Sequence, residues 1–206
     1  MISRTSLIPL WVKVPYTVFL CVQVPVYWIW LGPENFLWAS DIALFVTLAA
    51  LWLESRLLVS MMTLAVLLPE LLWNVDFFGR LLGGDVLGAS ATVYMFDQET
   101  PLFVRGLSLF HVVLPVLLLW MLFRLGYDKR ALPAQTLLAW IVLPISYWFT
   151  EPAKNINWVF GLGQSPQELM PGIWYLLLMM VLLPLLVYLP THWLLQRLFK
   201  GLGRPA

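Results

Sequence analysis

Long apolar stretches constrain this chain more than any other feature of its sequence. A helix needs about 20 apolar residues to cross the hydrocarbon core of a bilayer, and six stretches approach or exceed that length. They cover residues 8–31, 36–53, 57–74, 103–123, 132–150 and 172–195. Charged or turn-forming residues separate them. We therefore predict an all-α membrane protein in which residues 1–206 form a single domain of six transmembrane helices.

The overall composition supports a membrane protein and excludes several other classes. The chain is 61% hydrophobic and only 11% charged, which is far more apolar than a soluble domain of this size. A net charge of +1 without a basic run gives no indication of nucleic-acid binding. Cys21 is the single cysteine, so the sequence has neither a disulfide framework nor a CxxC metal site. We expect membrane lipids as partners and leave a homo-oligomer or another membrane protein open.

The distribution of lysine and arginine predicts the orientation. With a cytoplasmic N-terminus, nine of the 12 basic residues fall on the inner side, and Arg80, Arg105 and Lys154 fall on the outer side. Because basic residues favour the cytoplasmic side of a membrane, we predict that both termini are cytoplasmic. The long connections 75–102 and 151–171 then lie outside. We expect the location to be a bacterial cytoplasmic (inner) membrane.

Polar residues gather near the predicted outer ends of four helices. They are Ser40, Asp41, Glu70, Asn74, Arg105, Ser108, His111, Ser146, Tyr147, Thr150, Glu151, Asn155 and Asn157. Polar groups at membrane depth must satisfy one another. The sequence therefore predicts one outward-opening polar cavity between the second, third, fourth and fifth helices, with Asp41, Glu70, Arg105 and His111 as its charged or titrating members.

These residues also have a purely structural interpretation. Membrane bundles use serine, threonine and asparagine side chains to hydrogen-bond neighbouring helices, and a lone histidine in a helix is usually structural. Two acids, an arginine and a histidine at one depth are less typical of packing and favour a functional site. His192, near the inner end of the last helix, is interpreted as interfacial.

A hydroxyl beside an imidazole is the minimum for nucleophilic acyl transfer. In this hypothesis the catalytic residues are Ser40 as nucleophile, His111 as base and Asp41 as the group that orients the imidazole, a role that Glu70 could also fill. Arg105, Asn74 or Asn157 could stabilise an oxyanion. The substrate would be the ester or thioester region of a lipid, with no cofactor. The candidate substrate-binding residues are Glu70, Asn74, Arg105, Tyr147, Asn155 and Asn157.

Two other uses of the same residues stay open. The carboxylates and His111 could relay a proton or coordinate a solute in a transport or binding protein, although the absence of an internal repeat speaks against a secondary transporter. His111 with Asp41 and Glu70 also matches a histidine–carboxylate ligand set. No HExxH-type spacing supports a metal site, so we predict none.

Three segments together resemble YwaF-like bacterial integral membrane proteins. "WASDIALF" (38–45) resembles a polar motif early in a helix, where those proteins carry a Cys-Asp or Cys-Asn pair. "LSLFHVVLP" (107–115) resembles their mid-chain helix with a histidine, and "NINWVFGLGQSPQELMPGIWY" (155–175) resembles the loop and aromatic-rich helix start that follow. The resemblance covers most of the second to sixth helices.

That superfamily is similar to six-helix animal lipid enzymes, namely androgen-induced hydrolases of branched fatty-acid esters and a transmembrane phospholipid acyltransferase. These use an intramembrane threonine or cysteine with a histidine, so the resemblance implies Ser40 and His111 as the corresponding pair. The departure is serine for cysteine. Serine needs stronger help from a base because its proton is less acidic than that of a thiol. Thr47 lies deeper than the predicted polar layer and is not favoured.

Overall fold

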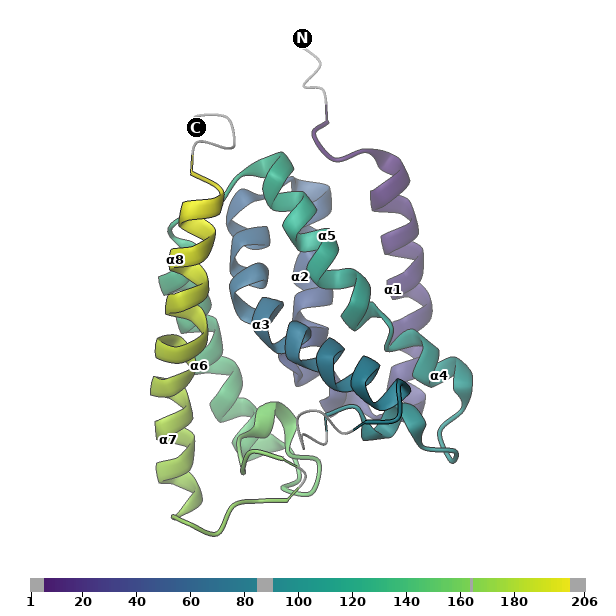
Figure 1. Ribbon diagram of the computed structural model, residues 1–206, viewed down its shortest axis with the longest axis vertical. Helices are drawn as coiled ribbons and strands as arrows, with labels where there is room; N and C mark the ends of the chain where they lie inside the picture. Colours follow the sequence, from purple (N-terminus) through teal and green to yellow (C-terminus); the bar gives the residue numbers. More distant parts are fainter. Residues whose placement is uncertain (1–5, 85–90, 164, 201–206) are drawn as a thin grey trace.

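The computed structural model describes residues 6–84, 91–163 and 165–200, and the regular structure in these ranges is helical (Figure 1). The α-helices are α1 (Leu10–Trp30), α2 (Ala39–Leu53), α3 (Arg56–Leu81), α4 (Leu102–Leu107), α5 (Phe110–Leu125), α6 (Ala131–Phe149), α7 (Gly172–Leu183) and α8 (Leu189–Leu198). Three short 3-10 helices lie in the connections, η1 (Pro33–Leu37), η2 (Val93–Phe96) and η3 (Ile156–Trp158), and a π-helical turn, η4 (Pro184–Tyr188), joins α7 to α8.

Five helical units in the described ranges are long and apolar enough to cross a membrane. They are α1, α3, the α4–α5 unit, α6 and the α7–α8 unit. The remaining predicted span, 36–53, contains the shorter apolar helix α2, whose 15 residues extend about 22 Å. The helical membrane character predicted from the sequence is thus confirmed, while a sixth crossing by α2 stays a prediction.

The structure moves several predicted boundaries. Helix α3 continues to Leu81, seven residues beyond the predicted end, so the following connection is shorter than predicted. The predicted helix 103–123 is broken between α4 and α5 at Ser108 and Leu109, just after Gly106, a residue that weakens helices. The last predicted helix contains the π-helical turn, which begins at Pro184, a residue that disrupts the regular hydrogen-bond pattern of an α-helix.

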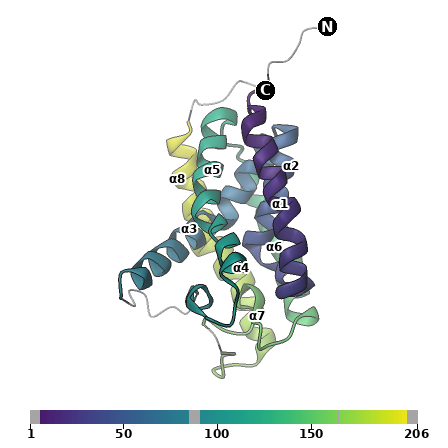
Figure 2. The same ribbon diagram turned by 90° about the vertical axis from the view of Figure 1, so that its right-hand side faces the viewer.

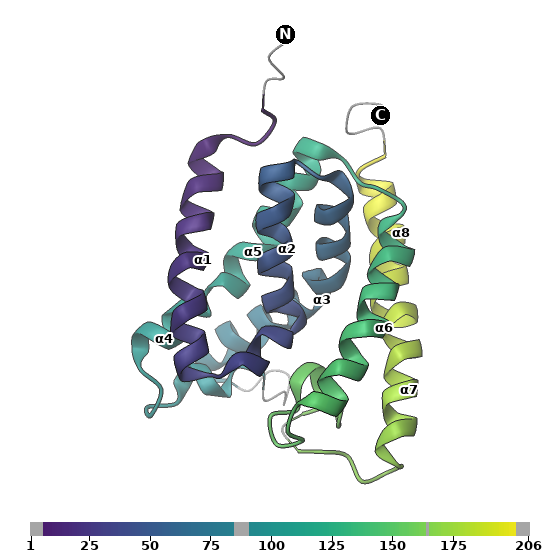
Figure 3. The ribbon, with the colours of Figure 1, turned by 180° about the vertical axis from the view of Figure 1, so that it is seen from behind.

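Helix α3 is the centre of the bundle. It packs against α2, α5, α6 and α8, with α1 and α2 towards one side and α6 to α8 towards the other (Figures 1 and 3). Its C-terminal part leans away from the other long helices (Figure 2). The start of α1 and the end of α8 lie at the same end of the bundle, while the connections from α3 to α4 and from α6 to α7 lie at the other.

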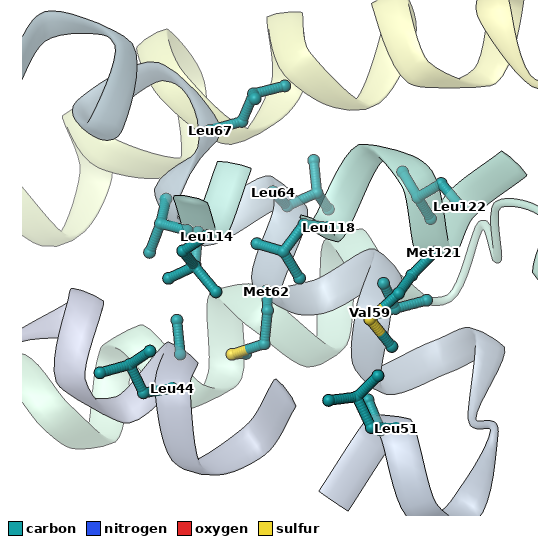
Figure 4. Close-up of a cluster of buried hydrophobic side chains, with 14 of the residues drawn as sticks. Leu44, Leu51, Val59, Met62, Leu64, Leu67, Leu114, Leu118, Met121 and Leu122 are labelled. Carbon is teal, nitrogen blue, oxygen red and sulfur yellow. The ribbon is translucent and has the colours of Figure 1, made fainter. Parts of the chain in front are cut away.

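The core between α2, α3 and α5 is apolar. Its fully buried side chains include Leu44, Leu51, Val59, Met62, Leu64, Leu114, Leu118, Met121 and Leu122 (Figure 4). In a membrane the lipid is as apolar as these side chains, so close packing holds such a core together. This core lies between the two polar ends of the bundle.

An ion pair joins the start of α1 to the end of α2. Lys13 Nζ lies 2.9 Å from Glu54 Oε1, and the backbone amides of Leu7 and Ile8 donate to the same carboxylate at 3.0 and 3.2 Å. The Ser6 hydroxyl donates to it as well. Burial alone would raise the pKa of Glu54, but these hydrogen bonds outweigh it and lower that pKa to about 2.

We expect Glu54→Gln to destabilise the folded protein by about 2 kcal/mol at pH 7, because it removes charge-assisted hydrogen bonds. Since the pKa falls from 4.5 to about 2 on folding, the ionised carboxylate stabilises the protein fully above pH 4.5. This contribution is lost as the pH falls towards 2. The difference in thermal unfolding between wild type and variant, measured in detergent by circular dichroism, should shrink over that range.

Glu168→Gln, at an exposed position, is the control for this prediction. Equal stability of Glu54→Gln and wild type at pH 7 would contradict the role given to Glu54.

Candidate functional site

A histidine–carboxylate pair links α3 to α5. His111 Nδ1 lies 2.6 Å from Glu70 Oε2, and their side chains are 13% and 3% exposed. Asn74, one turn after Glu70, donates from Nδ2 to the backbone carbonyl of His111 at 2.8 Å and to that of Glu70 at 2.7 Å. The Asn74 amide therefore fixes the backbone on both sides of the pair, and the predicted proximity of Glu70, Asn74 and His111 is present in the structure.

An aromatic side chain further restrains the imidazole. The Trp73 ring stacks on His111 with centroids 4.6 Å apart and planes inclined by 22°. Trp73 is itself 7% exposed and stacks on Phe77 on its own helix. The imidazole is thus held by a carboxylate at one edge and an indole on one face. In the part of the chain that the structure describes, the hydrogen bond of its Nδ1 to Glu70 is its one side-chain hydrogen bond, and Nε2 has no such partner.

Asp41 lies in the same layer but is held by amides. Gln23 Nε2 donates to its Oδ1 at 3.1 Å, and Asn35 Nδ2 donates to its Oδ2 at 3.2 Å. Asp41 is 4% exposed and interacts electrostatically with His111 and Glu70. These contacts explain how an apolar helix accommodates a carboxylate, because hydrogen bonds from two amide donors offset part of the free-energy cost of burying it.

Arg105 is placed differently from the prediction. Its Nη1 donates to the backbone carbonyl of Met95 at 2.9 Å, so it holds the segment that precedes α4. The described residues show no hydrogen bond or ion pair between Arg105 and Asp41, Glu70 or His111. Arg105 lies on the short helix α4, before the break that precedes His111, and helix α5 alone brings the predicted histidine into the layer.

Ser40 neighbours Asp41 in the first turn of α2 and is half-buried. No hydrogen bond joins its hydroxyl to His111, or to any other group, within residues 6–84, 91–163 and 165–200. Consecutive helical residues point in directions about 100° apart, so the Asp41 side chain and the Ser40 side chain do not face the same neighbour. The predicted Ser40–His111 pair is therefore not in hydrogen-bond contact in this structure.

The loop after α6 is tied to the start of α2 by Asn157. The Ala39 amide donates to Asn157 Oδ1 at 2.9 Å, and Asn157 Nδ2 donates to the Leu37 carbonyl at 2.7 Å and to Ser146 Oγ at 3.0 Å. Lys154 and Glu34 add an ion pair at 2.5 Å across the same two segments, and the hydrogen bond from Lys154 lowers the pKa of Glu34.

Asn155 and Tyr147, both predicted to bind substrate, shape this loop in the structure. Asn155 Nδ2 donates to the carbonyls of Gly161 and Gly163 at 2.8 and 2.9 Å, and its Oδ1 accepts from the Phe160 amide at 3.0 Å. The Tyr147 ring stacks on Phe160 with centroids 5.0 Å apart. These contacts hold the loop in place, and Asn157 is the member of the set that connects it to the segment containing Asp41.

The sequence prediction missed several members of the layer. Gln23 binds Asp41, and Tyr27, four residues later on the same face of α1, is hydrogen-bonded to Ser108 at 2.7 Å. The spacing of two polar side chains by four residues in an apolar helix was the available signal. The packing of Trp73 on His111 gave no signal in the sequence, because aromatic residues are frequent throughout this chain.

Two further features of the described residues bear on the chemistry. No group of three or more histidine, cysteine, aspartate or glutamate side chains in these ranges is arranged to hold a metal ion. The other histidine, His192 on α8, is hydrogen-bonded to Tyr127 at 2.6 Å and also contacts Gln196. It lies in the first half of α8, and α8 is at the end of the bundle opposite to the loops that follow α3 and α6 (Figure 1).

We expect Asn157→Gly to lower the unfolding free energy by about 2 kcal/mol, because it removes three hydrogen bonds. Asn157→Ala should cost about 1 kcal/mol more, since Asn157 has a φ of 54° and alanine is strained in this left-handed region. Thermal unfolding in detergent provides the measurement. Lys154→Ala removes a partly exposed ion pair and should change stability by less than about 1 kcal/mol. A larger effect of Lys154→Ala than of Asn157→Gly would contradict the role given to Asn157.

Comparison with known proteins adds no further assignment. No family model, curated protein or solved structure matches the chain. The chemistry of this protein is therefore argued from the arrangement of its own residues.

Proposed function

We propose that this protein is a membrane enzyme that hydrolyses or transfers the acyl group of a lipid ester. The observation that carries the proposal is the 2.6 Å contact between Glu70 and His111 Nδ1. In acyl-transfer sites a carboxylate on one imidazole nitrogen orients the ring, and the other nitrogen accepts the proton of the nucleophile. His111 has this arrangement, with Nε2 as the nitrogen available for proton transfer.

The surroundings of the pair favour a lipid substrate. Both residues belong to helical units that are apolar enough to span a membrane, so a molecule that reaches them arrives from, or along, the bilayer. Towards the other end of the bundle the pair is followed by the apolar core that contains Leu64, Leu114 and Leu118 (Figure 4). An apolar core next to the polar pair offers no polar path for a solute between α3 and α5. A reaction with a lipid at the pair needs no such path, and the arrangement therefore favours a lipid substrate.

The nucleophile is either Ser40 or water. The resemblance to YwaF-like proteins favours Ser40, which would have to move to reach His111. In the water route, His111 Nε2 takes a proton from water while the oxygen attacks the ester carbonyl carbon. Collapse of the tetrahedral intermediate breaks the bond to the alcohol oxygen, which receives the proton from the imidazolium and leaves the carboxylic acid as product.

A second candidate function is lipid or solute binding, or transport, without catalysis. The observation that favours it is the lack of a hydrogen bond between Ser40 and His111 among the described residues. Asp41, held by two amides, and the Glu70–His111 pair would then bind a polar headgroup or a proton. The two candidates differ in whether the bound lipid is turned over.

We expect His111→Ala to lower kcat/KM for a long-chain acyl ester by at least about 100-fold, the usual contribution of a general base. The assay follows release of fatty acid by the purified protein in lipid nanodiscs. Glu70→Gln should lower kcat/KM by at least about tenfold, because it weakens the orientation of the imidazole. His192→Ala is the matched control and should leave turnover unchanged. Equal turnover by His111→Ala and wild type would contradict catalysis by this pair.

A fluorophosphonate probe distinguishes the two nucleophiles. If Ser40 attacks, Ser40→Ala and His111→Ala should both lose labelling and turnover, while Ser165→Ala, at an exposed loop position, keeps both. If water attacks, turnover should survive in Ser40→Ala and disappear in His111→Ala. Lipid binding by wild type without any turnover would reject the enzyme and favour the second candidate.

A further inference from the structure

The Trp73 indole N–H is a buried donor beside the proposed base. Trp73 lies one turn after Glu70 on α3, is 7% exposed, and stacks on the His111 ring at 4.6 Å. Its Nε1 is enclosed and forms no hydrogen bond of normal geometry with any group in the described ranges. A buried donor without an acceptor is unfavourable, so an acceptor atom supplied by a ligand would stabilise this position.

Tyr94 brings a second hydroxyl donor to the same place. The residue is 38% exposed overall, and its hydroxyl lies beside the Trp73 N–H and the Ser108 hydroxyl, within electrostatic range of Glu70 and Asp41. Burial raises the pKa of Tyr94 to about 12. The phenol is therefore protonated at neutral pH and is able to donate a hydrogen bond.

The segment that carries Tyr94 is fixed over α3. Thr92 donates from its backbone amide and its hydroxyl to Asp76 Oδ2, at 3.0 and 2.7 Å, and Asp76 is 1% exposed. On the other side of Tyr94, the Met95 carbonyl accepts from Arg105. These two attachments hold Tyr94 against Trp73 without using either donor.

The donors predicted from the sequence are already engaged. Arg105 donates to the Met95 carbonyl, Asn74 donates to the carbonyls of Glu70 and His111, and Asn157 donates to Leu37 and Ser146. Asn74 and Asn157 hold the fold together through these bonds. Arg105 keeps a buried Nε without a hydrogen bond, but it lies on α4 and no hydrogen bond or ion pair in the described residues joins it to His111 or Glu70. Trp73 differs, because its donor lies next to the imidazole, forms no hydrogen bond of normal geometry in the described part of the chain, and has the Tyr94 hydroxyl as its polar neighbour.

We propose that Trp73 Nε1–H and the Tyr94 hydroxyl bind the carbonyl oxygen of an acyl ester and stabilise the negative charge that develops there. This inference rests on the proposed function. Attack on the carbonyl carbon moves an electron pair onto this oxygen, and donors that already point at it lower the barrier. The stacking of Trp73 on His111 sets the donor and the base side by side, as attack on one carbonyl group requires.

An open groove lies beside the segment that carries Tyr94. It has a volume of about 370 Å³ and is lined by Arg80, Gly83, Gly84, Val93 and Phe96. Phe96 contacts Phe77 at 5.8 Å between ring centroids, and Phe77 stacks on Trp73 at 5.1 Å. These ring contacts connect Phe96 in the groove to the indole through Phe77. In the proposal an acyl chain lies along these rings and its carbonyl group reaches Trp73.

The test uses a long-chain methyl ketone with a ¹³C-labelled carbonyl, which mimics the ester but cannot be hydrolysed. Infrared spectra of the wild-type protein in nanodiscs should show the carbonyl band at lower frequency than in empty nanodiscs. Trp73→Phe and Tyr94→Phe should each remove part of this shift and weaken binding about three- to tenfold, as expected for loss of one neutral hydrogen bond. Tyr175→Phe, which removes a buried hydroxyl on α7, and Trp174→Phe, at an exposed position, are the controls.

The outcomes separate this inference from the proposed function. An unshifted band in the wild type, or an equal shift in wild type, Trp73→Phe and Tyr94→Phe, overturns the carbonyl site even if the protein hydrolyses esters. A shift that depends on Trp73 and Tyr94 supports the site even if no ester is turned over, in which case the proposed catalysis fails and the site binds carbonyl compounds.

Discussion

The hydrogen bond between Glu70 and His111 determines much of the arrangement around it. A carboxylate 3% exposed in a membrane-spanning helix needs a partner, because unpaired charge in a low-dielectric environment is strongly unfavourable. The imidazole on α5 supplies that partner, and the contact between α3 and α5 is the most extensive in the bundle. Asn74 then fixes the backbone at both residues, and Trp73 fixes the plane of the ring. The helices are thus held in one register at the depth of the pair.

Side chains near the Glu70–His111 pair also hold the neighbouring loops against the helices. Asn157 holds the start of α2, and therefore Asp41, against the loop that follows α6. Asp76 holds the segment with Tyr94 against α3. In both cases a buried side chain binds backbone groups of a distant segment, and such groups would otherwise be unpaired near the membrane. The polar layer is therefore built from loops as well as from helices.

The sequence was sufficient for the fold class and insufficient for the contacts. Hydropathy predicts helix positions because length and apolar composition are local properties, and five of the predicted spans lie in helices that could cross a membrane. Topology also placed Asp41, Glu70 and His111 at similar depth. Which of them touch depends on the rotation of each helix about its axis, and the hydropathy of these nearly uniform helices does not encode that rotation. Asp41 is held by Gln23 and Asn35, which are not among the residues predicted for the polar layer. The break at Ser108 and Leu109 sets Arg105 apart from His111, and at this break Ser108 contacts Tyr27 of α1, a tertiary contact that hydropathy does not encode.

The polar groups lie at one end of the bundle, and this position bears on whether the protein could transport a solute or act on a lipid. A path for a solute between α3 and α5 would need polar side chains along the whole interface, but Leu64, Leu114 and Leu118, one to two turns from Glu70 and His111 on these helices, belong to the buried apolar core. These side chains exclude water from one side of the pair, and an electrostatic interaction is stronger where water is excluded. In the proposed function, His111 as base, Glu70 as the orienting carboxylate and two neutral donors would be matched to a reaction in which charge develops on a neutral ester. They are poorly matched to an ion that must enter on one side and leave on the other.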